Sequence, residues 1–482
     1  MTKKQDVRKH NIQYCKKHHI IFPTLAELIH PERLPDKIKL KLKKTKITDL
    51  DPINLFRINW KNSLKTKLFG KVNYLEIPPE ITGVKARIFG IVGKYFPTGS
   101  HKVGPTYNCL ISKIISGEFD LTKNIAVWPS TGNFCRGGVY NCALLGCKSI
   151  GILPEEMSKE RFIWLNKIGA KVISTPGSES SIKEVFDKSH ELKKDPHHII
   201  INQFDDFENA LFHYYITAEA IKEVYEHEIK TSNSCLSAFI CGTGSAGTIA
   251  TGDNLKETYP SLKTIIVEPL QCPTISSNGY GIHRIEGIGD KHIPWIYNVR
   301  NTDAVVSIDD EDCMRIMRLF NKKEGLKVLQ HYGMSTQYGK LLSLLGISSI
   351  CNLLAAIKTA KYYDLNENDV LCTCFTDSMD LYQSRIRDED KKKGKYTILQ
   401  AEKDFDSCIK HQSIDYFNEL NYQDKKKIHH LKYFTWVEQQ GKTAIALNQL
   451  WKLDFWKDLY TIGMQNFDEK VHQFNKEVTQ IT

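Results

Sequence analysis

The chain has 482 residues, more than a single hydrophobic core usually holds, so two or more packed units are expected. Its 41% hydrophobic and 25% charged residues exclude a disordered or a fibrous protein. No stretch approaches the roughly 18 consecutive apolar residues of a membrane helix, and the N-terminus lacks the apolar core of a signal peptide. We therefore expect a cytoplasmic protein that does not act at a membrane.

The net charge of +10 is concentrated at the N-terminus. Residues 1–47 contain 13 Lys and Arg against 4 Asp and Glu. Such a segment can contact nucleic acid, but it has no interleaved aromatic residues and no DNA-binding motif. The composition favours a solvated extension over residues 1–55, with no nucleic-acid partner.

The 13 cysteines are an odd number and show no CxxC spacing. This pattern favours reduced thiols that serve as small core residues over disulfides or a metal site. We predict no bound metal.

In chain order, residues 1–55 lack clear periodicity, except that the alternating run 37–42 could be a strand with one basic face. Apolar strands then alternate with helices of 10 to 15 residues, which predicts an α/β fold whose parallel sheets are covered on both faces. The first group is expected to have strands at 125–128, 149–153 and 171–174 and helices at 136–145, 158–168 and 182–192. The second is expected to have strands at 236–241, 263–267 and 370–375 and helices at 249–258 and 348–363.

The two groups predict a catalytic domain over residues 56–386 that consists of two lobes. The small lobe covers about residues 104–215, and the large lobe is the remainder. Beyond residue 386 the sequence is charged and aromatic with helical spacing, so we expect a helical extension over residues 387–482.

A lysine lies in the Gly- and Pro-rich loop of residues 96–104, just before a predicted helix at 105–115. Gly99 and Gly104 allow the backbone around Lys102 to crowd against a ligand, which is an unusual setting for a surface lysine. The alternative is a solvated lysine at a helix start, because most lysines are exposed.

A glycine-rich turn joins the strand 236–241 to the following helix. Such turns direct backbone N–H groups at one point beside the positive end of the helix dipole and so bind phosphate. The turn also satisfies GxGxxG, and Glu268 lies 21 residues beyond its last glycine, so an NAD-linked oxidoreductase is the rival hypothesis. Its hydroxyl groups suit the three oxygens of a terminal phosphate better than the pyrophosphate of NAD. Its residues are Gly242, Thr243, Gly244, Ser245, Ala246, Gly247 and Thr248.

Two further loops follow strand ends. Ser130, Thr131, Gly132 and Asn133 open a helix and form a cradle suited to a carboxylate, although Ser130 or Thr131 could equally cap that helix. Ser378 places a neutral hydroxyl at the carboxyl edge of the sheet, where α/β proteins bind ligands.

In order and spacing, these motifs over about residues 84–386 closely resemble the fold-type II pyridoxal phosphate enzymes, which include cysteine synthase, cystathionine β-synthase, threonine dehydratase and the tryptophan synthase β subunit. The matching runs are SHK at 100–102, STGN at 130–133, GTGSAGT at 242–248, VEP at 267–269, GIG at 287–289 and GISS at 346–349. The resemblance implies a homodimer and a glutamate at position 268 that is not a ribose ligand.

The resemblance also assigns roles. Lys102 would carry pyridoxal 5'-phosphate as a Schiff base and remove the α-proton of an amino acid, with His101 beside it and Asn133 near the cofactor's 3-hydroxyl. The turn 242–248 would bind the phosphate. Ser378 would meet the pyridine nitrogen, although Asp377 is adjacent, and its neutral hydroxyl favours loss of a β-substituent over transamination. The substrate would contact Ser130, Thr131, Gly132, Gly287 and Gly289.

Arg136 stands where small residues are common in this family, and it could bind a second anion on the substrate or pair on the helix surface. The resemblance implies β-replacement on an activated serine through an aminoacrylate intermediate. Elimination or deamination, as by a dehydratase, ammonia-lyase or desulfhydrase, is the alternative. The NAD oxidoreductase and a non-catalytic binding module remain as hypotheses from other classes.

Overall fold

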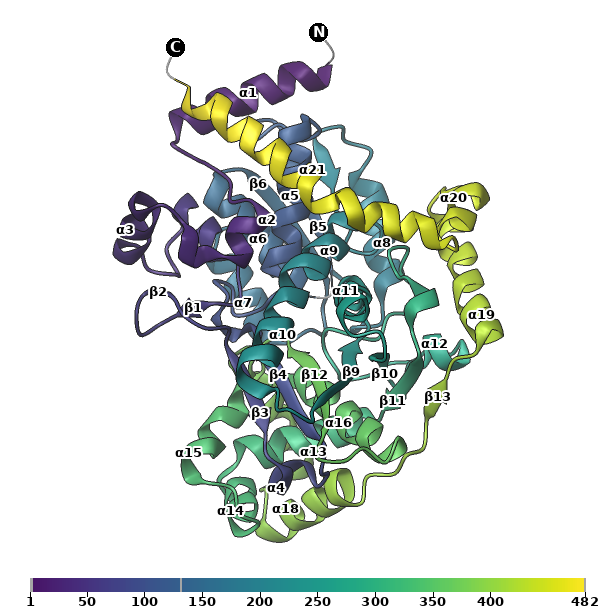
Figure 1. Ribbon diagram of the computed structural model, residues 1–482. Helices are drawn as coiled ribbons and strands as arrows, with labels where there is room; N and C mark the ends of the chain where they lie inside the picture. The colour runs from purple at the N-terminus through teal and green to yellow at the C-terminus, as the bar shows by residue number, and fades with distance from the viewer. Residues whose placement is uncertain (1–2, 131, 481–482) are drawn as a thin grey trace.

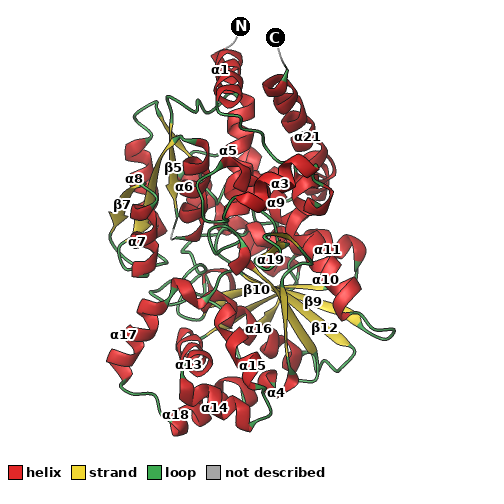
Figure 2. Cartoon of the chain, turned by 90° about the vertical axis from the view of Figure 1, so that its left-hand side faces the viewer, coloured by secondary structure: helices red, strands yellow, loops and turns green. Residues whose placement is uncertain are grey.

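The computed structural model describes residues 3–130 and 132–480, which form two separate sheets rich in parallel strands (Figures 1 and 2). The small sheet has the order β7-β6-β5-β8, and its strands are all parallel. Three of its strands match the predicted ranges. The fourth, β8, was not predicted. The bounds are β5 (Ile125–Pro129), β6 (Lys148–Pro154), β7 (Lys171–Thr175) and β8 (His198–Ile200).

The large sheet has seven strands in the order β13-β11-β10-β9-β12-β4-β3. Its five central strands are parallel, and β3 and β13 pair antiparallel at its two edges. The bounds are β3 (Tyr74–Ile77), β4 (Arg87–Val92), β9 (Cys235–Gly242), β10 (Lys263–Pro269), β11 (Ala304–Ile308), β12 (Asp369–Phe375) and β13 (Phe417–Glu419), and a separate hairpin comprises β1 (Asn62–Ser63) and β2 (Leu68–Phe69).

Helices cover both sheets. Figure 2 shows α6 and α8 on either side of β5, and α16, whose residues are almost all buried, packs on the central strands of the large sheet. In the first half of the chain the helices are α1 (Lys3–Lys17), α2 (Leu25–Ile29), α3 (Asp36–Lys44), α4 (Pro79–Thr82), α5 (Val103–Ser116), α6 (Asn133–Leu145), α7 (Lys159–Lys167), α8 (Ile182–Leu192), α9 (Phe207–Phe212) and α10 (Ala218–Val224). In the second half they are α11 (Ala250–Thr258), α12 (Thr274–Ser277), α13 (Asp310–Asn321), α14 (Lys323–His331), α15 (Thr336–Gly339), α16 (Ile347–Tyr362), α17 (Gln383–Lys393), α18 (Ile398–Phe405), α19 (Tyr422–Lys432), α20 (Ala444–Gln449) and α21 (Leu453–Thr479).

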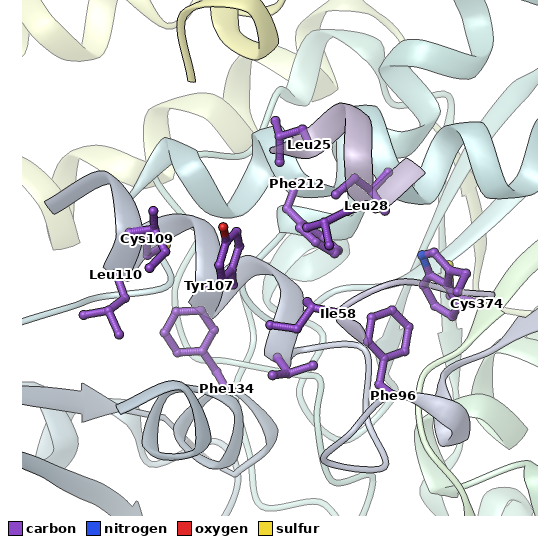
Figure 3. Close-up of a cluster of buried hydrophobic side chains, with 14 of the residues drawn as sticks. Leu25, Leu28, Ile58, Phe96, Tyr107, Cys109, Leu110, Phe134, Phe212 and Cys374 are labelled. Atoms are coloured by element: carbon purple, nitrogen blue, oxygen red, sulfur yellow. The ribbon is translucent and has the colours of Figure 1, made fainter. Parts of the chain in front are cut away.

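The N-terminal residues contribute to the core. Figure 3 shows Leu25 and Leu28 of α2 near Phe212, in a buried cluster that also includes Tyr107 of α5 and Phe134 of α6. Burial of such side chains contributes roughly 1.5–3 kcal/mol each. The helix that follows Lys102 is therefore packed on several sides, which holds the lysine loop in place.

The possible strand at residues 37–42 is wrong, because this segment lies in helix α3. Leu42 is fully buried, and Ile38, four residues earlier on the same helix face, packs against the same small cluster. Leu40, between them, is 59% exposed. The alternation of Lys with Ile and Leu is compatible with the two-residue period of a strand and with the 3.6-residue period of a helix. Leu and Lys are good helix formers.

The two ends of the chain lie side by side (Figure 1). Helix α1 packs against α21 and α5, and Arg8 forms a bidentate hydrogen-bonded pair with Glu477 at 2.7–2.8 Å. The C-terminal residues are mainly helical as expected, with β13 as an addition that pairs with β11. The domain boundaries at residues 55 and 386 stay predictions.

Among residues 3–130 and 132–480, no single helix is long and apolar enough to cross a membrane. One pair, Thr336–Leu344 with Ile347–Tyr362, meets the criterion together but bends by 112° at its break. The second member of this pair is α16, which is buried against the large sheet.

Candidate active site

The loops that carry the predicted site residues meet at the carboxyl ends of parallel strands from both sheets. The loop after β4 leads to Lys102, the loop after β5 starts at Ser130, and the turn after β9 starts at Thr243. The segment after β12 touches the lysine loop through a bridge between Ser100 and Asp377. Parallel strands direct their following loops to one edge, so residues far apart in sequence are brought together there.

Lys102 directly precedes α5, and its amine lies inside a cavity. Nζ donates a hydrogen bond to Ser245 Oγ at 2.9 Å, which connects the lysine to the predicted phosphate turn. Removal from water lowers the pKa of this amine from the ordinary 10.5 to about 8. A neutral amine, which a nucleophile or a base requires, is therefore accessible near neutral pH.

His101 anchors the lysine loop to the large sheet. Its backbone N–H donates to the carbonyl of Thr376 at 3.2 Å, and its Nδ1 lies 3.2 Å from the same oxygen. Burial and the neighbouring lysine charge lower the pKa of His101 to about 3, so the ring is neutral. A neutral ring adds no repulsion to a protonated Lys102.

The turn 242–248 begins at the end of β9 and leads into α11. Ala246 adopts a left-handed conformation with φ of +66°, which makes a sharp bend. Ser245 Oγ accepts hydrogen bonds from Lys102 and, at 3.0 Å, from Asn209 Nδ2. Gly247 faces Asn209 so closely that a Cβ there would lie 2.1 Å from Asn209 Oδ1. Asn209 was not predicted, because nothing in its local sequence indicates this contact.

The segment 287–290 packs on that turn. The N–H of Gly289 donates to the carbonyl of Thr243 at 2.9 Å, so the GIG run and the glycine-rich turn form one wall of the cavity. Gly287 lines the cavity, as do Ile288 and Asp290. Asp290 was not predicted, although it directly follows the GIG run.

The predicted carboxylate loop lies opposite the end of β12. Ser130 Oγ accepts from the N–H of Gly132 at 3.0 Å, and both Ser130 and Asn133 line the cavity. Thr131 lies outside the described residues. Asn133 Nδ2 donates to Asp377 Oδ2 at 2.6 Å, so the loop is held from the other sheet.

After β12, three consecutive residues take different positions. Thr376 lines the cavity, and its hydroxyl lies 2.8 Å from that of Ser348. The carboxylate of Asp377 accepts from Asn133 and from Tyr382 Oη, both at 2.6 Å. Ser378 is buried but is not among the lining residues. The hydroxyl that β12 presents to the cavity is thus that of Thr376, and the contact of Ser378 with a pyridine nitrogen stays a prediction.

Arg136 is buried just outside the cavity. Its Nε donates to the carbonyl of Thr98 at 2.8 Å, and its guanidinium lies 3.9 Å from the ring centre of Trp164. Burial and the nearby Arg161 lower the pKa of Arg136 to about 9. These contacts give Arg136 a role in holding the lysine loop, and its proposed contact with a second substrate anion stays a prediction.

Ten of the predicted residues line the cavity, and six others do not: Gly132, Arg136, Thr243, Gly247, Gly289 and Ser378. The predicted residues that line it are His101, Lys102, Ser130, Asn133, Gly242, Gly244, Ser245, Ala246, Thr248 and Gly287. The additional lining residues are Phe134, Gln203, Cys241, Ile288, Asp290, Ser348, Asn352, Cys374 and Thr376.

The chemistry of this cavity fits pyridoxal phosphate. Within residues 3–130 and 132–480, the buried Oδ1 atoms of Asn133 and Asn352 have no hydrogen-bond partner, and both side chains line the cavity. Buried polar atoms of this kind normally have partners. A ligand with a phenolic hydroxyl, a ring nitrogen and a phosphate would supply such partners beside an accessible amine.

Glu268 does not support a dinucleotide site. Its two carboxylate oxygens accept hydrogen bonds from the backbone N–H groups of Ile275 and Ser276 at 2.8 and 3.0 Å, and the side chain is 1% exposed. It caps α12 and has no access to a ribose. This removes one of the two features on which the NAD alternative depended, the acidic residue beyond the GxGxxG turn.

The fold and this site define an enzyme of the fold-type II pyridoxal phosphate class. The sequence matches the family model for pyridoxal-phosphate dependent enzymes over residues 93–336, and the chain belongs to that family. Pyridoxal 5'-phosphate is its cofactor and amino acids are its substrates. The expected fold class and cofactor are thereby confirmed.

Individual relatives are about 30% identical to this chain over the aligned residues. A probable cysteine synthase of Bacillus subtilis is 32% identical over 269 residues, which cover 55% of this chain and 78% of that protein. A cysteine synthase of Staphylococcus aureus is 29% identical over 259 residues, which cover 54% and 75%.

Solved structures of related enzymes have the same fold. A hydrogen sulfide-producing enzyme of Fusobacterium nucleatum superimposes with a TM-score of 0.56 at 28% identity, over 65% of this chain and 97% of that one. An O-acetylserine dependent cystathionine β-synthase of Helicobacter pylori gives 0.55 at 26%, over 65% and 95%.

Proposed function

We propose that the protein catalyses β-replacement on an activated serine, in the manner of cysteine synthase. The observation that carries the proposal is the amine of Lys102, whose pKa is lowered to about 8 inside a cavity that two glycine-containing loops and neutral hydroxyls surround. Relatives with the names cysteine synthase and O-acetylserine dependent cystathionine β-synthase support the same reaction type.

Pyridoxal phosphate, when bound, withdraws electrons from the α-carbon of an attached amino acid. Lys102 Nζ is then the group that takes and returns the α-proton, because it is the amine of the cavity and is neutral near pH 8. Residues 242–248 bind the phosphate with backbone N–H groups and the hydroxyls of Ser245 and Thr248. Ser130 would bind the substrate carboxylate, and Asn133, whose Oδ1 has no partner among the described residues, would accept from the cofactor's 3-hydroxyl.

The wall formed by β12 favours loss of a β-substituent. The hydroxyl-bearing residues Thr376 and Ser348 line the cavity there, whereas Asp377 does not line it, and its Oδ2 accepts from Asn133 and Tyr382. A hydroxyl holds a ring nitrogen in its protonated state less effectively than a carboxylate does. Weak electron withdrawal by the ring favours departure of a good β-leaving group over transamination.

The test is to mix the holoenzyme with O-acetylserine, O-phosphoserine, cysteine, serine and threonine, with and without sulfide. β-Replacement requires release of the leaving group and formation of a new β-substituted amino acid only when a nucleophile is present. Failure of every donor to release its leaving group would contradict the proposal.

A second candidate is a reaction that releases hydrogen sulfide from cysteine, because two similar solved structures are those of hydrogen sulfide-producing enzymes of Fusobacterium nucleatum. Sulfide, together with ammonia and a keto acid, would then form from cysteine without any added nucleophile. The homodimer and the cytoplasmic location stay predictions, and sedimentation of the purified protein would test the first.

A further inference from the structure

The cavity contains a carboxylate that the proposed reaction does not yet use. Asp290 is the only acidic side chain among the described residues that line the cavity, and it is 8% exposed. No hydrogen bond or ion pair joins its carboxylate to any residue of 3–130 or 132–480. Burying a carboxylate without such partners destabilises the folded protein. Its presence therefore indicates that it has a function in the cavity.

The backbone fixes this side chain on both sides. Gly289 N–H donates to the carbonyl of Thr243, and the carbonyl of Gly289 lies 2.9 Å from His283 Nε2. Thr274 Oγ1 donates to the carbonyl of Asp290 at 2.9 Å. Gly289 has a φ of +85°, and a Cβ there would lie 2.5 Å from Pro269, so the position requires glycine. The carboxylate is therefore presented from a rigid wall.

Asp290 is not simply the counter-ion of the lysine. The charges of Asp290 and Lys102 interact across the cavity, but no ion pair forms between them, and Lys102 Nζ donates to Ser245 instead. Burial raises the pKa of Asp290 to about 7, against the opposing effect of Lys102. A carboxylate with a pKa near the working pH is a more effective base than an ordinary aspartate.

We propose that Asp290 is a catalytic residue, the base that takes the proton of a thiol or water nucleophile as it adds to the β-carbon of the bound substrate. The inference rests on the proposed β-replacement. It identifies the group that accepts the nucleophile's proton in the second half of the reaction. Lys102 cannot serve here, because it holds the α-proton until the α-carbon takes it back.

When a thiol adds, each bond that breaks is matched by one that forms. The S–H bond breaks and its proton goes to a carboxylate oxygen of Asp290, while the sulfur electron pair forms the bond to the β-carbon. The α-carbon takes its proton from Lys102. Asp290 then releases its proton to solvent, and this proton balances the leaving group, which departed earlier as an anion.

The test compares two nucleophiles on the holoenzyme with O-acetylserine as the donor. 2-Mercaptoethanol at pH 6.5 is almost entirely protonated at its thiol, because thiols have pKa values near 8.5. Azide arrives as an anion and needs no base. Asp290→Asn should slow thiol addition about 10²-fold, the usual contribution of a general base, and slow azide addition no more than about threefold.

Acetate release is measured in the same samples. If acetate is released but thiol and azide addition fall equally, or thiol addition does not fall, then Asp290 is not the base and the proposed function survives. If the wild type releases no leaving group from any donor, the proposed function fails and the assignment of Asp290 fails with it.

The matched control is Asp253→Asn. Asp253 is also buried with a raised pKa, about 6, but it lies outside the cavity and accepts hydrogen bonds from Asn298, Asn301 and Tyr460. This variant should lose stability without changing the ratio of the thiol rate to the azide rate. A changed ratio would assign the effect to stability and overturn the proposal.

A second readout uses the cofactor-free protein. A carboxyl whose pKa is raised by folding loses its stabilising contribution as the pH rises from about 4 to about 7. The Tm of Asp290→Asn relative to the wild type should therefore rise over that range and stay constant above it. A difference that does not vary with pH would show that Asp290 does not titrate as the proposal requires.

Discussion

Asn133 Nδ2, at the start of α6 beside the small sheet, donates a 2.6 Å hydrogen bond to Asp377 Oδ2, just after strand β12 of the large sheet. Both side chains are buried, and Tyr382 Oη donates to the same oxygen at 2.6 Å. One carboxylate thus sets the distance between the predicted substrate loop and the opposite wall of the cavity.

Replacing Asp377 by Asn should weaken substrate binding. The new amide places donors where Asn133 and Tyr382 already donate, and loss of a buried hydrogen bond to a charged group costs about 1.5–3 kcal/mol. The KM of the amino-acid donor should rise roughly 10- to 100-fold, as measured by steady-state kinetics. The control is Asp380→Asn, because Asp380 is exposed and pairs with Lys94 at the surface. Equal effects of the two variants would contradict the role of Asp377.

Gly247→Ala should weaken cofactor binding because its Cβ would lie 2.1 Å from Asn209 Oδ1. Overpacking of this kind costs about 1–3 kcal/mol, so affinity for pyridoxal phosphate should fall at least about fivefold in a fluorescence titration. The double variant Gly247→Ala with Asn209→Ala removes the clash and should recover part of the loss. Gly70→Ala, whose Cβ meets only Ser63 at 3.7 Å, is the control. If the double variant binds more weakly than Gly247→Ala alone, the contact does not explain the effect.

Lys102→Met should abolish the absorption band of the bound cofactor, since no amine remains to hold it. It should also change how stability of the cofactor-free protein depends on pH. An amine whose pKa is about 8 when folded and 10.5 when unfolded adds stability as the pH rises through that window. The Tm of the wild type minus that of Lys102→Met should therefore increase between pH 8 and 10.5. Parallel curves would show that the amine is not desolvated.

Lys432→Met tests how the C-terminal residues support the cavity. Lys432 is fully buried in α19 and donates to the carbonyls of Trp295 and Tyr297 at 3.0 and 2.7 Å, a few residues after Asp290. The variant leaves two buried carbonyls without donors, at about 1–3 kcal/mol each. We expect a lower Tm and faster hydrogen exchange over residues 290–300.

Lys427→Met, an exposed position on the same helix, should change neither Tm nor exchange and serves as the control. Unchanged exchange over residues 290–300 in Lys432→Met would show that α19 does not stabilise that segment.

The sequence predicted the parts of the fold with strong local signals. Apolar strands followed by glycine-containing loops located β5 and β9, and with them the loop 130–133 and the turn 242–248, and the Gly- and Pro-rich loop 96–104 located Lys102. It missed α1, since this helix is held by polar contacts. Asn11, for example, donates to the carbonyls of Ile114 and Phe119 and accepts from Leu121 N–H, a pattern that apolar periodicity does not reveal.

The prediction of the site was limited in a similar way. Asp290 and Asn209 have ordinary neighbours in the sequence, and only the packing of segments 287–290 and 207–212 against the glycine-rich turn gives them their positions. The choice among Thr376, Asp377 and Ser378 also depends on the direction of each side chain after β12. Which of these consecutive residues faces the cavity is set by tertiary contacts such as that of Asp377 with Asn133.

The pairing of Arg8 with Glu477 has a consequence for biosynthesis. The partners are separated by 469 residues, so at 5–20 residues per second the first helix emerges from the ribosome roughly 20–90 s before α21 exists. During that interval its inner face has no α21 to cover it. Nascent chains of this protein should therefore recruit chaperones at their beginning until translation ends.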